Sequence, residues 1–184
     1  MHYVIVGNGV AGMEAALALR GRDAKARISL VSAEHDHFFS RPALMYVFAG
    51  QMRLQDTEPY DRQLYGRMRF ERVSKRVKAV EAPEKALVFE DGSRLGYDAL
   101  LLALGSRARP APWPGSEGPG MHAFVTLRDL EALDRAAAKG GRAIVIGGGL
   151  VGVEAAEVLH DRGLHVTFVV RESWYFPLAL DRSE

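Results

Sequence analysis

Short runs of apolar residues alternate with amphipathic stretches along this chain. The runs at 3–7, 27–32, 97–105 and 165–170 are rich in aliphatic residues, as is typical of strands inside a parallel sheet. The run at 97–105 contains three consecutive leucines and is expected to be fully buried. Because helical stretches separate most of these runs, the pattern predicts an α/β fold.

Helices are expected between the strands. Gly21 follows the first amphipathic stretch, and glycine is common just past a helix C-terminus. Thr126 with Asp129 three residues later is typical of a helix N-cap. The expected helices cover 10–20, 126–139 and 150–162, and a shorter helical segment begins at Ala43.

Polar and apolar residues alternate between 69 and 97. With turns at Pro83-Glu84 and Asp91-Gly92, this alternation predicts a meander of short antiparallel strands. The stretch 109–120 is dense in proline and glycine and is the best linker, so the predicted domains are 1–109 and 110–184. The expected strands of the meander are 70–73, 76–81, 86–90 and 94–97.

A glycine pattern follows two of the apolar strands. The segment VIVGNGVAGMEAA at 4–16 matches IVIGGGLVGVEAA at 144–156. In G-x-G-x-x-G the first glycine allows a tight turn, the second lets the backbone approach a pyrophosphate, and the third lets helix and strand pack closely. The phosphates then meet the helix N-terminus. One copy is compatible with a simple tight turn, whereas two copies predict two dinucleotide sites.

The residue that closes the second strand of such a unit is usually acidic and bonds the ribose hydroxyls. In the first unit Ser32 holds this place, and Glu34 is the nearest carboxylate, either a ribose ligand or a solvated loop acid. In the second unit Val170 closes the strand and Arg171 follows, so a guanidinium is available for the 2′-phosphate of NADPH. Glu172 could instead reach the ribose of NADH, and we expect NADPH to be favoured.

Composition excludes several classes of function. With 24 basic and 23 acidic residues, the net charge of +1 does not indicate nucleic acid as a partner. No apolar run approaches the roughly 20 residues of a membrane span, and the first residues do not resemble a signal peptide, so we expect a cytoplasmic protein. The absence of cysteine excludes disulfides, thiolate metal sites and a cysteine redox relay within these residues.

The stretch after 32–34 contains candidate polar ligands. His35, Asp36 and His37 resemble metal ligands, but without further ligands in view we interpret them as a polar loop and predict no metal site. Arg41 precedes Pro42, which restricts it to an extended or turn conformation. An arginine held in this way could line a planar cofactor.

In combination, the two glycine patterns, FSRPAL at 39–44 and LLALGSRARP at 101–110 resemble the FAD-dependent pyridine nucleotide-disulfide oxidoreductase superfamily. Within these two-dinucleotide-binding flavoproteins, the likeness is to the flavin subunits of NADH:rubredoxin, ferredoxin and nitrite reductases. The resemblance implies two Rossmann-like parallel-sheet units with an antiparallel meander in the first. It implies that FAD contacts Gly7, Gly9, Val10, Ala11, Gly12, Ser32, Glu34, Arg41, Pro42, Val77, Ala103, Leu104 and Gly105. It implies that the nicotinamide nucleotide contacts Gly147, Gly149, Leu150, Val151, Gly152, Glu154 and Arg171.

The implied activity is hydride transfer from NADPH or NADH to FAD, followed by electron transfer to a small redox protein, a quinone or a small oxidant. Glu154 and Arg41 are the residues expected to lie nearest the reacting rings, with helix-end electrostatics as the alternative role of Glu154. The other function class left open is a non-catalytic nucleotide-binding or regulatory fragment.

The chain also departs from the family pattern. It lacks the cysteine pair of the disulfide-reducing branch, so we expect no disulfide reduction through its own thiols. Met45 and Tyr46 stand where the ferredoxin-type reductases usually carry serine and lysine, and Leu104 replaces a threonine. Family members return to the FAD domain after the nucleotide domain. We therefore expect an N-terminal portion that binds FAD weakly by itself and whose exposed sheet edge allows a homodimer.

Overall fold

The computed structural model describes residues 1–176, 180, 181 and 183. The chain forms two compact units, one of Met1–Arg41 with Leu54–Arg107 and the other of Pro42–Arg53 with Ala108–Glu184. Each unit combines parallel strands with helices, so the α/β prediction is confirmed. The predicted boundary at 109 lies close to the observed one, whereas the segment 42–53 belongs to the second compact unit. The assignment of FAD to one unit and the nicotinamide nucleotide to the other stays a prediction.

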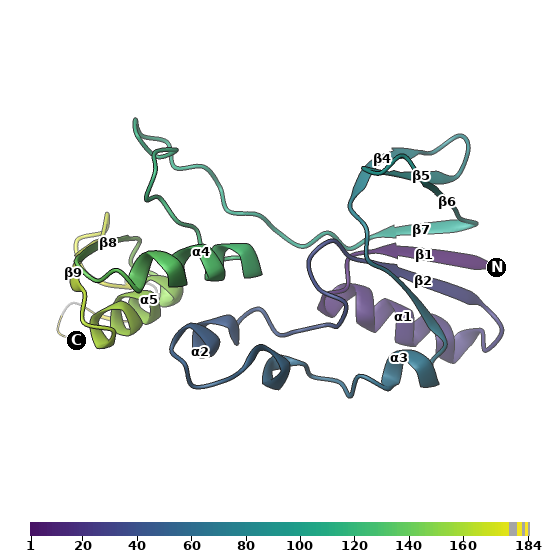
Figure 1. Cartoon of the computed structure of the whole chain (residues 1–184), viewed down its shortest axis with the longest axis horizontal. Coiled ribbons are helices and arrows are strands. Elements are labelled where there is room, and N and C mark those ends of the chain that lie inside the picture. The colour runs from purple at the N-terminus through teal and green to yellow at the C-terminus, as the bar shows by residue number, and fades with distance from the viewer. Residues whose placement is uncertain (177–179, 182, 184) are drawn as a thin grey trace. The chain divides into compact units, whose positions relative to one another are not determined.

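The first unit is built on a parallel sheet whose order, over the described residues, is β3-β2-β1-β7 (Figure 1). Helix α1 packs on one face, against Ile5, Ile28 and Leu30. The opposite face, with Val4 and Val6, packs against a second, antiparallel sheet. Because successive side chains of β1 point to opposite faces and both faces are covered, the strand is apolar from Tyr3 to Val6. The elements are β1 (His2–Val6), α1 (Val10–Arg22), β2 (Arg27–Val31), η1 (Leu54–Thr57), α3 (Leu64–Arg67), β3 (Phe70–Val73) and β7 (Ala99–Leu102).

The antiparallel sheet is the predicted meander, with one correction. It consists of β4 (Val77–Glu81), β5 (Ala86–Phe89) and β6 (Arg94–Gly96). The prediction that Phe70–Val73 is its first strand is wrong, because β3 pairs in parallel with β2, with Phe70 opposite Ile28. The residues between β2 and β3 are numerous enough for the long connection that parallel pairing requires, and alternation alone does not reveal strand direction.

Two other predictions about this unit are wrong. Strand β7 is not fully buried, since Leu101 and Leu102 are 41% and 53% exposed at the edge of the described sheet. Gly21 does not cap α1 but lies within it, and the helix ends where the Asp23 N–H donates to the Leu19 carbonyl at 2.8 Å.

The second unit contains the parallel strands β8 (Arg142–Ile146) and β9 (His165–Val169) with helices α4 (Leu127–Ala137) and α5 (Leu150–Asp161). The predicted N-cap of α4 is confirmed: Thr126 accepts the Asp129 N–H at 3.1 Å, and the Asp129 carboxylate accepts the Thr126 N–H at 2.8 Å. Helix α2 (Leu44–Phe48) joins this unit, because the Phe48 ring lies 4.7 Å from the Arg162 guanidinium. Among the described residues, no helix has the length and apolar character that a membrane crossing requires.

Candidate dinucleotide-binding sites

The two glycine patterns fold into the same turn. Each begins where the first strand of its unit ends, and its first glycine donates its N–H to the end of the neighbouring strand: Gly7 to the Val31 carbonyl at 2.8 Å and Gly147 to the Val169 carbonyl at 3.0 Å. The φ angles of these glycines are 121° and 122°, a region that side chains disfavour. The first glycine of each copy therefore allows the turn that the sequence predicts.

The second and third glycines have different surroundings. A Cβ on Gly12 would lie 1.9 Å from the Gly7 carbonyl oxygen, and one on Gly152 would lie 2.0 Å from that of Gly147. A Cβ on Gly9 or Gly149, in contrast, would meet no atom within 4 Å. The third glycine is thus required for packing, whereas the second leaves open space in which a ligand can approach the backbone. This arrangement fits a pyrophosphate.

The helices that follow present free N–H groups beside these open glycines. Helices α1 and α5 have Gly9 and Gly149 as N-caps, with no side-chain hydrogen bond to the cap and no acidic residue in the first turn. The first N–H groups of a helix have no intrahelical acceptor, and the helix dipole favours an anion there. Both helix starts can therefore bind phosphate. The residues that open them, Val10, Leu150 and Val151, are exposed.

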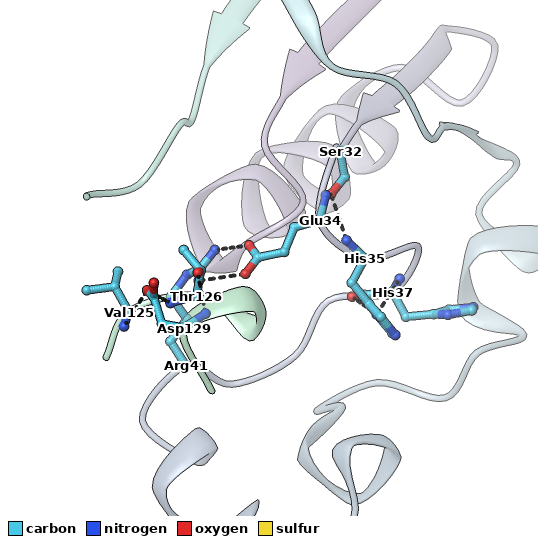
Figure 2. Close-up of polar contacts among 8 residues, drawn as sticks. All are labelled: Ser32, Glu34, His35, His37, Arg41, Val125, Thr126 and Asp129. Atoms are coloured by element: carbon cyan, nitrogen blue, oxygen red, sulfur yellow. Dashed lines mark hydrogen bonds and ion pairs between the residues drawn. The ribbon is translucent and has the colours of Figure 1, made fainter. Parts of the chain in front are cut away.

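The loop after β2 brings two of the predicted FAD contacts together. Arg41 forms an ion pair with Glu34 at 2.5 Å, a pairing that the sequence alone did not reveal (Figure 2). The Ser32 hydroxyl accepts the N–H groups of Glu34 and His35 at 3.3 and 3.4 Å, so it shapes this loop. Contact of Ser32, Glu34 and Arg41 with a ribose or a flavin stays a prediction.

A polar cluster lies in the same unit. Glu58, which the sequence analysis missed, lies with His35 and His37 so that one ligand-type atom of each falls within 4.8 Å of the others. All three side chains also have protein partners: Arg72 donates to His37 Nε2 at 2.7 Å, Arg62 pairs with Glu58 at 2.7 Å, and His35 Nδ1 lies 2.9 Å from a backbone carbonyl. With two guanidinium groups on these atoms, we interpret the cluster as a polar network that supports the loop.

This network predicts a pH dependence of stability. The pKa of His37 lies below its usual value of 6.5, chiefly because burial disfavours the charged ring; Glu58 opposes this effect, while Arg72, Arg62 and His35 add to it. The unfolded chain therefore binds a proton at this imidazole more readily than the folded protein does as the pH falls through 6.5. The free energy of unfolding should therefore decrease as the pH is lowered from about 7.5 to about 5.5, a range above that in which carboxylates take up protons.

Urea unfolding of wild type and His37→Gln across this range measures the effect. Glutamine keeps an acceptor for Arg72 but does not titrate, so the slope of the free energy of unfolding against pH should be smaller in this variant. Part of the slope should remain, because burial also lowers the pKa of His2. The matched control is His122→Gln, at an exposed position. An unchanged slope in His37→Gln would contradict the assignment.

Three further predicted FAD contacts, Ala103, Leu104 and Gly105, follow β7 at the carboxyl end of the first parallel sheet, whereas Pro42 belongs to the second compact unit. The Ala103 N–H donates to the Val6 carbonyl at 2.8 Å. A Cβ on Gly7 would lie only 2.0 Å from the Ala103 carbonyl oxygen, so this segment packs closely on the first glycine. Leu104 is exposed, and Gly105 has a φ of 69°. Val77, at the start of β4, packs against the cluster that contains Val6. The structure thus gathers the 103–105 segment at the first glycine turn.

In the second unit, the end of β9 lies beside the glycine turn, because a Cβ on Gly148 would lie 2.6 Å from Val170 Cγ1. Arg171 follows with its side chain 92% exposed and pairs with Glu172 at 2.6 Å. Glu154 is exposed in α5. The resemblance implies that glutathione reductase-like proteins carry a second arginine for NADP a turn after the first; the corresponding position here is Pro177, which lies outside the described residues. Both Arg171 and Glu172 are therefore accessible to a nucleotide.

Comparison with known proteins identifies the family. Residues 1–183 match the pyridine nucleotide-disulphide oxidoreductase family. The chain is a member of this family. It is 33% identical over 169 residues to the ferredoxin--NAD(+) reductase subunit of a benzene 1,2-dioxygenase system from Pseudomonas putida, an alignment that covers 91% of this chain and 41% of the relative.

Two further matches agree with the predicted branch of this family of oxidoreductases. The ferredoxin--NAD(+) reductase component of an anthranilate 1,2-dioxygenase system from Burkholderia cepacia is 36% identical over 173 residues, which cover 91% of this chain and 42% of the relative. The structure of a covalent putidaredoxin reductase-putidaredoxin complex matches with a TM-score of 0.80 and 27% identity, over 98% of this chain and 44% of the other. The chain thus spans about two fifths of the length of these relatives.

Proposed function

We propose that this chain supplies dinucleotide-binding parts of a flavoprotein reductase that passes a hydride from NADPH or NADH to FAD and electrons onward to a redox protein. The observation that carries the proposal is the pair of glycine turns, each with an open second glycine, a third glycine against the carbonyl of the first, and an unbonded helix start. The names of the family relatives support a ferredoxin-type acceptor.

Within this proposal, the residues of the chain bind and orient. The turn at Gly7–Gly12 and the start of α1 hold the FAD pyrophosphate, and the turn at Gly147–Gly152 holds that of the nicotinamide nucleotide. Bound FAD would supply the redox chemistry, since it accepts a hydride and passes electrons on singly or in pairs. Glu154 is the carboxylate that we propose orients the nicotinamide. A cytoplasmic location and a homodimer also stay predictions.

Flavin absorbance tests the proposal directly. The protein reconstituted with FAD should be yellow and should bleach under anaerobic conditions when NADPH or NADH is added. Bound flavin that fails to bleach would favour the second candidate, a non-catalytic nucleotide-binding or regulatory fragment. A protein that binds a nicotinamide nucleotide but no flavin would contradict the proposal.

The end of β9 predicts which nicotinamide nucleotide is preferred. The relatives named above carry NAD(+) in their names. In this chain, however, Val170 closes β9 where an acid would repel a 2′-phosphate, and the exposed Arg171 that follows offers a guanidinium that can bind one. A charge-assisted hydrogen bond contributes about 1.5–3 kcal/mol, so Arg171→Ala should weaken NADPH binding roughly tenfold to hundredfold and change NADH binding little.

Titration of both nucleotides against each variant measures this effect. The control is Arg142→Ala, since Arg142 is exposed and begins β8 at the end remote from the glycine turn. If the ratio of the two affinities is the same in wild type and Arg171→Ala, then Arg171 is a surface residue and Glu172 becomes the candidate ribose ligand.

A further inference from the structure

The middle residue of the first glycine turn, Asn8, holds the loop that follows β2. Its Nδ2 donates to the Asp36 carbonyl at 3.1 Å. Its Oδ1 accepts the Tyr65 hydroxyl at 3.0 Å, and the same hydroxyl accepts the Phe38 N–H at 2.8 Å. One carboxamide therefore contacts the loop directly at Asp36 and, through Tyr65, at Phe38.

Tyr65 is suited to this role because it cannot move freely. Its side chain lies in the core beside α1, with the residue only 3% exposed. Its ring packs edge-on against His37 at 5.4 Å, and the Arg72 guanidinium lies 5.4 Å from the ring centroid. The hydroxyl group thus occupies a defined position between the glycine turn and the loop. Leaving the part-buried Phe38 N–H without this acceptor would destabilise the loop.

The second glycine turn has no equivalent of this contact. Gly148 occupies the position of Asn8, and the space that a side chain would need there is filled by Val170, whose Cγ1 would lie 2.6 Å from a Cβ. After β9, the Arg171 side chain extends into solvent. Over the residues that the structure describes, the two turns therefore share a backbone conformation but differ in whether a side chain of the turn holds the loop after the second strand.

The loop that Asn8 fastens carries the Glu34 and Arg41 pair, whose groups suit a dinucleotide: a carboxylate can bond ribose hydroxyls and a guanidinium can bond a diphosphate. Holding such groups in place before binding increases affinity, because less conformational entropy is lost on binding. We propose that Asn8 is a positioning residue that, through Tyr65, presents Glu34 and Arg41 to the dinucleotide at the first turn. This inference rests on the proposed function, which places FAD there.

The test combines amide exchange with affinity, in the full chain and in the variants Asn8→Ala and Tyr65→Phe. Without FAD, exchange of the Phe38 amide should accelerate at least tenfold in both variants. The dissociation constant for FAD, measured by flavin fluorescence, should rise about tenfold, while that for the nicotinamide nucleotide should not change. Thermal unfolding confirms that each variant is folded. The matched control is Tyr60→Phe, which removes a hydroxyl that donates to Glu14 at 2.7 Å.

A double variant separates positioning from general support. The double variant combines Asn8→Ala with Glu34→Gln. If Asn8 acts through Glu34, the loss of FAD binding free energy in the double variant should be smaller than the sum of the losses in the two single variants. Additive losses would overturn the proposal, as would faster Phe38 exchange with unchanged FAD affinity, or unchanged exchange in both variants. If the wild-type protein binds no FAD, the proposed function fails and the inference fails with it. Equal FAD binding by wild type and variants overturns the inference alone.

Discussion

Replacing Gly12 with alanine will unfold or strongly destabilise the protein, whereas replacing Gly9 will weaken FAD binding at nearly unchanged stability. A methyl group on Gly12 would lie 1.9 Å from the Gly7 carbonyl oxygen and 3.0 Å from its carbon, so α1 would have to move away from the turn. Because backbone cannot yield as a flexible side chain can, the cost should be at least about 3 kcal/mol.

Gly9 differs because its neighbourhood is open. Its φ of −101° suits alanine, and no atom lies within 4 Å of the added methyl group. Loss of a good N-cap should cost no more than about 1 kcal/mol. The methyl group would, however, occupy the space through which a pyrophosphate approaches the backbone. The dissociation constant for FAD should therefore rise by at least about tenfold, as lost contacts of about 1.4 kcal/mol imply.

The second turn provides an internal replicate. Gly152→Ala should destabilise the folded protein, since its methyl group would lie 2.0 Å from the Gly147 carbonyl oxygen. Gly149→Ala should weaken only the binding of the nicotinamide nucleotide. Unfolding curves and titrations of both nucleotides against all four variants measure the pattern. If the Gly9→Ala variant binds FAD as tightly as wild type does, the open side of the first turn is not the pyrophosphate site.

Arg20→Ala will lower the free energy of unfolding by about 2–4 kcal/mol, because it removes a half-buried guanidinium that donates hydrogen bonds to several backbone carbonyls. Arg20 Nε donates to the Met68 carbonyl at 2.8 Å, and Nη1 donates to the Ala26 carbonyl at 2.7 Å. Further bonds reach the carbonyls of Asp23 and Ala24, which precede β2, and of Arg69, which precedes β3. The guanidinium also lies 5.9 Å from the centroid of the Phe70 ring. The side chain thus links the end of α1 to the segments that enter β2 and β3.

Urea unfolding of the full chain measures this effect against Arg22→Ala, an exposed neighbour on the same helix whose removal should change stability by no more than about 0.5 kcal/mol. Arg20→Lys should recover less than half of the loss, since an ammonium group cannot match the planar set of donors. Equal stability of Arg20→Ala and Arg22→Ala would show that these bonds contribute no net stability.

Much of both nucleotide turns could be predicted from the sequence. The strand-turn-helix order, the tight turn at the first glycine, the close packing at the third and the capping box of α4 depend on residues a few positions apart, and the structure confirms them. That the second glycine admits a pyrophosphate stays a prediction. The family resemblance is likewise confirmed. The network around the first turn could not be predicted in this way. The hydrogen bond between Asn8 and Tyr65 joins residues separated by 57 positions, and Glu58 reaches His37 from a distant loop.

The sequence by itself therefore determined the two turns, because glycine spacing decides locally which backbone angles and which close approaches are allowed. Only the tertiary structure decided the direction of β3 and the exposure of β7. Alternating residues suit parallel and antiparallel pairing alike, and an apolar strand is buried only where another element covers it. Within the described part of the chain, the tertiary structure also decided that the first turn, and not the second, holds the loop of its unit: Asn8 bonds Tyr65, whereas Val170 fills the space beside Gly148.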